Sequence, residues 1–203
     1  MGTARAILIW AALVVALAVP LGVAASSPLL AWREPIYIVS GFAGAAAMGL
    51  LLLQPLLAGD YLPSLPRRRA RSVHRILGIL LVIAVLTHVI GLWITSPPDV
   101  IDALLFRSPT TFSAWGVIAM WAAFAAGLVA VLRRRLRLRP AVWRLCHLSM
   151  STLVVLGSVV HAMLIEGTMG MISKAALCAL VLTATVKIMI DMRPWTLSRG
   201  RKV

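Results

Sequence analysis

The sequence predicts an all-α protein, a polytopic membrane bundle of six transmembrane helices with both termini in the cytoplasm. The 203-residue chain is 61% hydrophobic and only 13% charged, whereas a soluble domain carries about 25% charged residues. Its mean hydropathy is +0.97, and its apolar stretches alternate with short polar loops. No polar segment is long enough to fold separately, so we predict one membrane domain over residues 1–203.

Six stretches reach the roughly 20 apolar residues that a membrane-crossing helix needs. They cover about residues 6–25, 36–57, 74–94, 112–132, 145–165 and 171–191. Prolines lie between most of them, and Gly167 and Gly170 mark a tight turn before the last. The first stretch also fits a signal peptide, with Arg5 before its apolar run. We favour a retained helix, because that run is long for a signal core.

The positive charge predicts the orientation of the helices. The formal net charge is +14, and arginines concentrate in the loops at 67–71 and 133–139 and in the tail at 193–202. These segments alternate with loops that hold few basic residues, so they belong on one side of the membrane, the cytoplasmic one. We therefore expect a multi-pass protein of the cell inner membrane. Basic residues placed between apolar stretches indicate contact with anionic lipid, not nucleic acid.

The four histidines form two identically spaced pairs. His74 and His88 are 14 residues apart in the third stretch, and His147 and His161 are 14 apart in the fifth. That spacing is about 21 Å along a helix, with the side chains within about 40° of one face. Both helices run outward, so His74 should face His147 near the inner surface and His88 should face His161 near the outer one.

Two such pairs fit the axial ligation of two b-type haems, because neutral imidazole is a standard ligand of haem iron. Small residues on the same faces, Gly78, Ser151 and Ser158, leave room for a flat macrocycle. A zinc site is disfavoured, because zinc needs its ligands around one point. Arg75 and Arg144 lie at the inner level, and we predict that they contact haem propionates. Snorkelling anchors at the membrane surface are their alternative role.

The segments that carry these histidines are RSVHRILGILLVIAVLTHVIGLW and WRLCHLSMSTLVVLGSVVHAMLIEG. They resemble the ferric reductase-like transmembrane family, which includes the membrane domain of NADPH oxidases and the haem subunit of periplasmic methionine sulfoxide reductase systems. The resemblance covers a core at about residues 40–192. It implies that the four histidines are haem ligands and that electrons reach an extracytoplasmic acceptor. The sequence holds no Gly-rich nucleotide fingerprint, so we expect a separate electron donor, a flavoprotein or a quinol.

The leading functional interpretation is an electron-transfer subunit of an oxidoreductase that reduces a periplasmic acceptor. Ferric iron, oxygen and the cofactor of a partner reductase are the candidates. A quinone-linked cytochrome b subunit is one alternative, since bilayer thickness imposes similar histidine spacing. A proton or ion transporter that depends on the histidines is another. Transport sites, however, gather near the midplane of the membrane, whereas these histidines belong near its two surfaces.

Two smaller features carry structural predictions. Lys187 and Asp191 are four residues apart and predict an ion pair on one helix face. The tryptophans at the ends of the stretches read as interfacial anchors and not as an electron path; they are Trp32, Trp93, Trp143 and Trp195.

Overall fold

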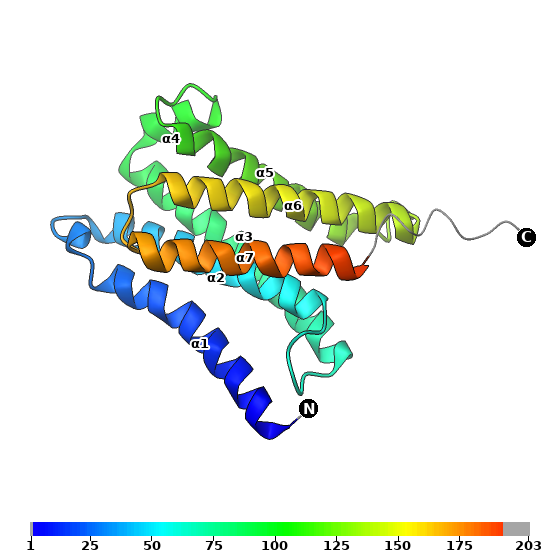
Figure 1. The fold of residues 1–203 in the computed structure, drawn as a ribbon. Coiled ribbons are helices and arrows are strands. Elements are labelled where there is room, and N and C mark those ends of the chain that lie inside the picture. The colour runs from blue at the N-terminus through cyan, green and yellow to red at the C-terminus, as the bar shows by residue number, and fades with distance from the viewer. Residues whose placement is uncertain (1, 193–203) are drawn as a thin grey trace, which may run out of the picture.

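The structure, a computed structural model, describes residues 2–192, and within that range it contains helices and no strand (Figure 1). The α-helices are α1 (Thr3–Ala25), α2 (Pro35–Ala58), α3 (Arg67–Thr95), α4 (Pro97–Leu104), α5 (Thr111–Leu132), α6 (Pro140–Leu164) and α7 (Met171–Met192). All except α4 are long and apolar enough to cross a membrane. The predicted all-α bundle of six spans is confirmed. The basic tail at 193–202, with Trp195, lies outside the described residues.

Two helices begin earlier than hydropathy predicts. Helix α3 starts at Arg67 and not near residue 74, and α6 starts at Pro140 and not near 145. Hydropathy marks only the apolar part of a helix, whereas arginine is itself a good helix former. Proline suits the first helical position, where its missing N–H costs nothing. As a result His74 and His147 each lie about two turns inside a helix, on rigid backbone.

Helices α2 and α3 form one antiparallel hairpin, and α5 and α6 form a second (Figure 1). Helix α7 packs against α2 and α6, while α1 leans along α2 and α7. The short helix α4, absent from the sequence prediction, joins α3 to α5 at one end of the bundle (Figure 1). The arginine-rich loops lie toward the other end, the α2–α3 loop near the start of α1 and the α5–α6 loop near the end of α7 (Figure 1).

The packed core lies mainly where α7 meets α2 and α6. Val181 is fully buried there, and Leu52 and Leu177 are nearly so, whereas the equally buried Ser40 lies between α2 and α3, where its hydroxyl donates to the His88 carbonyl. Many large apolar side chains elsewhere are exposed, among them Ile79 and Leu80 of α3. Exposed apolar side chains in this number indicate contact with a membrane and not with water, as expected for helices that face lipid. The chain is therefore a multi-pass membrane protein.

A polar cluster ties the α2–α3 loop to the end of α7. The predicted ion pair is confirmed, with Lys187 Nζ 2.9 Å from a carboxylate oxygen of Asp191. The Tyr61 hydroxyl donates to the same carboxylate, and the lysine ammonium lies 4.7 Å from the Tyr61 ring centroid. Partial burial, together with the hydrogen bond to Asp191, raises the pKa of Tyr61 to about 12. The tyrosine therefore remains a donor at physiological pH.

Candidate functional site

The four histidines meet across the interface between α3 and α6 in the two predicted pairs. We call His74 and His147 the inner pair, at the end with the arginine-rich loops, and His88 and His161 the outer pair. The ring centroids are 6.5 Å apart in the inner pair and 6.4 Å apart in the outer pair. The ring planes make angles of 74° and 79°. Helices α3 and α6 otherwise pack mainly against their own hairpin partners, α2 and α5.

These separations fit one metal ion between the rings of each pair. Two metal–imidazole bonds of about 2 Å, plus roughly 1 Å from each ring centre to its nitrogen, place the centroids about 6 Å apart. A direct aromatic contact between the rings would favour centroid distances from 4.5 Å upward, so the observed values lie at the long end for simple packing. The geometry of both pairs thus agrees with axial ligation of one iron at each level.

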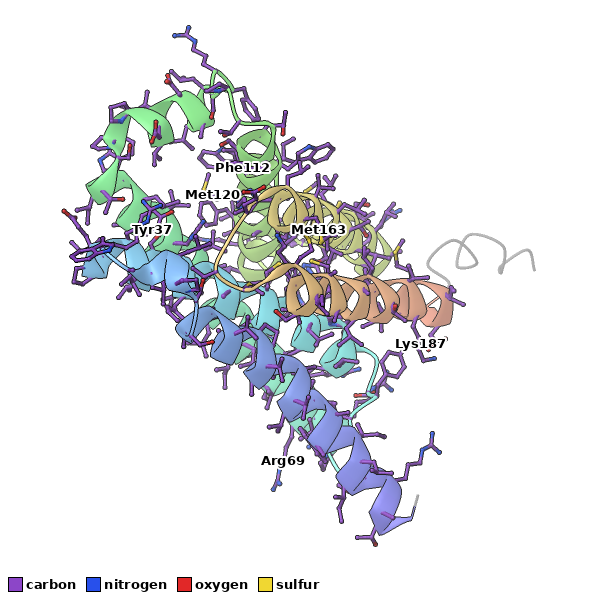
Figure 2. The ribbon with its side chains drawn as sticks, turned by 60° about the vertical axis from the view of Figure 1, so that its left-hand side comes forward. Tyr37, Arg69, Phe112, Met120, Met163 and Lys187 are labelled. Atoms are coloured by element: carbon purple, nitrogen blue, oxygen red, sulfur yellow. The ribbon has the colours of Figure 1, made fainter. Side chains whose placement is uncertain are left out.

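Hydrogen bonds orient both rings of the outer pair. Nδ1 of His88 lies 2.8 Å from the carbonyl oxygen of Ser40, and Nδ1 of His161 lies 2.8 Å from that of Phe112. Phe112 lies at the start of α5, close to α6 (Figure 2). A backbone carbonyl can only accept, so each Nδ1 carries the proton and each Nε2 keeps its lone pair. This tautomer is the one that a metal-binding histidine adopts, and its second hydrogen bond increases ligand basicity.

The inner pair is held less firmly. Nδ1 of His74 lies 3.3 Å from the carbonyl oxygen of Gln54, at the long limit for such a bond. Nδ1 of His147 is buried and has no hydrogen-bond partner. The carbonyl of Ala126 approaches it without reaching hydrogen-bond geometry. The two levels therefore share a ligand set but differ in how their rings are supported.

Glycines give the outer rings their space. A Cβ atom on Gly116 would lie 2.7 Å from Nδ1 of His161, and one on Gly44 would lie 3.0 Å from Nδ1 of His88. Gly78, beside the inner pair, has only the Gln54 amide within 4 Å, in keeping with the room predicted there. Gly157 instead packs against α5, since its Cβ would lie 2.9 Å from the Trp115 carbonyl oxygen.

The two hairpins repeat the same arrangement along the chain. In each hairpin, Nδ1 of a histidine on the second helix lies at hydrogen-bond distance from a backbone carbonyl of the first helix. The residue that carries this carbonyl is followed four positions later by a glycine that contacts the same ring. Ser40 and Gly44 of α2 correspond to Phe112 and Gly116 of α5, 72 residues later. The histidines of α3 and α6 correspond at an interval of 73. The histidine spacing is visible in the sequence, but the carbonyls and glycines are recognisable only once the helices are packed.

Unpaired polar atoms gather around the inner pair. Within the described range, the buried side-chain nitrogens without a partner are Gln54 Nε2, Trp143 Nε1, Arg144 Nε and His147 Nδ1. Buried donors normally find an acceptor, and the first three of these can only donate. Their presence here fits an acceptor-bearing group such as a propionate. Arg144 is half-buried, whereas Arg75 is exposed beside His74.

A known protein family matches most of the chain segment that carries these histidines. The model of the ferric reductase-like transmembrane component matches residues 40–158, more than half of the chain. The chain belongs to this family. The matched segment contains His74, His88 and His147 and ends three residues before His161. At the level of the ferric reductase-like family, the match indicates electron transfer across a membrane. Searches of curated proteins and of solved structures found no significant match.

Each histidine pair supplies the number of protein ligands that haem iron needs. Within residues 2–192, no group of three or more His, Cys, Asp or Glu side chains comes together as a site for a bare metal ion. In haem the macrocycle occupies four positions around the iron, which leaves two axial positions for the protein. The pair geometry, the free Nε2 atoms and the unpaired donors all fit that group.

Proposed function

We propose that this protein conducts electrons across the membrane through two b-type haems, one held by each histidine pair. The observation that supports this most directly is the matched geometry of the two pairs, at 6.5 and 6.4 Å, in a bundle of the ferric reductase-like family. The two levels lie about 21 Å apart along the helices. Haem iron, when bound, changes between ferric and ferrous states and accepts one electron at a time.

The residues of this chain hold and orient the two groups. Nε2 of each histidine would bind the haem iron, while the carbonyls of Ser40 and Phe112 orient the outer rings. At the inner level, the Gln54 amide and the half-buried Arg144 offer donors to the propionates. Arg75 would reach a propionate only if its exposed side chain turned inward. The helices around both levels are apolar, so we expect them to keep water away from the two groups.

Electrons would enter at the inner pair and leave at the outer pair. The arginine-rich loops lie beside the inner pair, and such loops stay in the cytoplasm, which gives N-in, C-in topology. The donor would be a flavoprotein or a quinol. The acceptor would lie outside the cytoplasmic membrane, with ferric iron, oxygen and a partner reductase as the candidate classes.

Two other functions make different demands on the site. A quinone-linked cytochrome b needs a quinol pocket near one haem, and the unpaired donors at the inner level suit a quinone carbonyl as well as a propionate. A proton or ion transporter would use the histidines without haem. The two pairs lie at two levels, not at one site near the midplane, which disfavours transport.

Optical spectroscopy of the purified protein tests the proposal. We expect a Soret band and, after dithionite reduction, α-band absorption typical of haem b, with about two haems for each protein. His74→Ala or His147→Ala should remove the inner haem, and His88→Ala or His161→Ala the outer one, because each iron loses an axial ligand. A folded, colourless protein would reject the cytochrome and leave the transporter.

A further inference from the structure

We infer that Trp143, backed by Arg133, is the positioning residue for the inner ligand His147. This inference rests on the proposed haem function and adds a role for two residues outside the ligand set. The indole of Trp143 lies flat on the imidazole of His147, with ring centroids 5.5 Å apart and planes 11° apart. On the indole, the guanidinium carbon of Arg133 lies 4.7 Å from the ring centroid.

The stack occurs at the one histidine that lacks a hydrogen bond. His88 and His161 have short bonds to carbonyls, and His74 has a long one, whereas Nδ1 of His147 has none. Without such a bond an imidazole can rotate about its side-chain torsions, which are broad for this residue type. A flat aromatic surface on one side restricts that rotation. Stacking therefore supplies at His147 the orientation that carbonyls supply elsewhere.

The position of Trp143 on α6 and its contact with Arg133 explain why the indole keeps its place. Trp143 precedes His147 by one helical turn on α6, so the two side chains share a face. Arg133 lies at the end of α5 and reaches across the α5–α6 loop. A guanidinium over the face of an indole is attracted to the ring, most strongly where water is excluded. Arg133, at the end of the first helix of the hairpin, thus holds the tryptophan of the second helix in place.

The equivalent position in the other hairpin confirms that the stack is local. The residue one turn before His74 is Ala70, which is buried and has no ring. His74 instead contacts the Gln54 carbonyl. Only one of the two inner ligands therefore depends on an aromatic neighbour, and a change at Trp143 should affect the inner site and spare the outer one.

The test compares Trp143→Phe, which keeps a flat ring, with Trp143→Leu and Trp143→Met, which keep apolar bulk without one. Trp121→Leu is the control, since Trp121 is exposed and contacts Phe124. The readouts are the haem-to-protein ratio, the redox titration of each haem and the EPR spectrum of the oxidised protein, which is sensitive to the angle between axial imidazole planes.

We expect Trp143→Leu and Trp143→Met to alter the EPR signal and potential of the inner haem and to lower the haem-to-protein ratio toward one. The outer haem and Trp121→Leu should match the wild type, and Trp143→Phe should change the inner haem less than the Leu and Met variants do, because it keeps a flat ring and loses only the indole N–H. Arg133→Gln should give a smaller change in the same direction, and it remains informative if the Leu and Met variants do not accumulate.

Three results would overturn the inference. The inner signal could be unchanged in the Leu, Met and Arg133→Gln variants, or both haems could change equally. Loss in Trp143→Phe equal to that in Trp143→Leu would assign the effect to the indole N–H and not to stacking. A wild-type protein without haem would instead defeat the proposed function, before any variant is compared.

Discussion

Gly116 lies directly against the ring of His161, so that a Cβ atom at this glycine would come 2.7 Å from Nδ1 of the histidine. The same ring uses Nδ1 to bond the Phe112 carbonyl one turn earlier on α5. The absence of a side chain at Gly116 is therefore what allows the histidine to approach α5 closely enough for this hydrogen bond. The His161 ring, the Phe112 carbonyl and Gly116 therefore depend on one another for this contact.

Gly116→Ala is expected to weaken the outer haem site selectively. The added methyl must displace the imidazole, and such overpacking costs about 1–3 kcal/mol. The haem-to-protein ratio should fall toward one, with the inner haem retained. Gly44→Ala, whose Cβ would lie 3.0 Å from His88, should have a milder effect in the same direction.

Two glycines on the same helices provide matched controls for these variants. Gly41 of α2 has nothing within 4 Å, and Gly127 of α5 has only a methyl of Val82 at 4.0 Å. Alanine at either position should leave both haems in place. If Gly127→Ala lost as much haem as Gly116→Ala, the contact with His161 would not be the cause.

The outer haem is expected to have the lower midpoint potential. Its ligands both have 2.8 Å hydrogen bonds at Nδ1, which make them more basic and stabilise ferric iron. At the inner level, Nδ1 of His74 has a hydrogen bond of 3.3 Å, and Nδ1 of His147 has none. The arginine-rich loops beside the inner site also favour the less positive, ferrous state. A redox titration monitored in the α band measures both potentials.

Variants that lack one haem assign the two potentials to their sites. Removing the outer haem by His88→Ala should eliminate the lower-potential component, and removing the inner one by His74→Ala the higher. The opposite assignment would show that the hydrogen bonds to Nδ1 of His88 and His161 do not set the order of the two potentials.

Reporter fusions check the proposed topology. A reporter active only in the periplasm should give no signal when fused after Arg137, in the α5–α6 loop, and a strong one after Asp102, in α4. The physical basis is the excess of arginine on one side of the bundle, which resists translocation. Signals in the reverse pattern would invert both the orientation and the direction of electron flow.

Reduced nicotinamide alone should not reduce the haems of the purified protein. Accepting a hydride needs a cofactor that splits two electrons into single steps, normally a flavin, whereas haem iron takes one. Adding a flavoprotein or a quinol should restore reduction. Rapid reduction by nicotinamide in a flavin-free preparation would mean that the chain acts as a reductase by itself.

Reduction by a flavoprotein donor should slow several-fold as salt rises, because an acidic donor would dock on the exposed arginines near the inner pair. Arg69 points away from the bundle (Figure 2), whereas Arg67 is paired with Asp60 at 3.0 Å. Arg68→Gln with Arg69→Gln should therefore slow reduction more than Arg67→Gln. Arg107→Gln, at the opposite end, is the control and should have no effect.

The sequence alone determined the number of spans, the histidine pairs and their assignment to two levels. Each of these follows from the rise and period of a helix in a bilayer, which are the same in every protein. The starts of α3 and α6 were missed because polar residues can extend a helix beyond its apolar part. Helix α4 was missed because an eight-residue helix leaves too short a periodic pattern to recognise.

Tertiary packing decided what surrounds each histidine. The carbonyls of Ser40 and Phe112 carry no sequence signal, because every residue has a carbonyl and only the helix register brings one to a ring. Gly44 carries no such signal either, because its contact with His88 depends on how α2 meets α3. Trp143 read as an interfacial anchor, yet the α5–α6 packing places its half-buried ring between Arg133 and His147. Contacts between helices depend on rotation and distance, which the spacing within one helix does not specify.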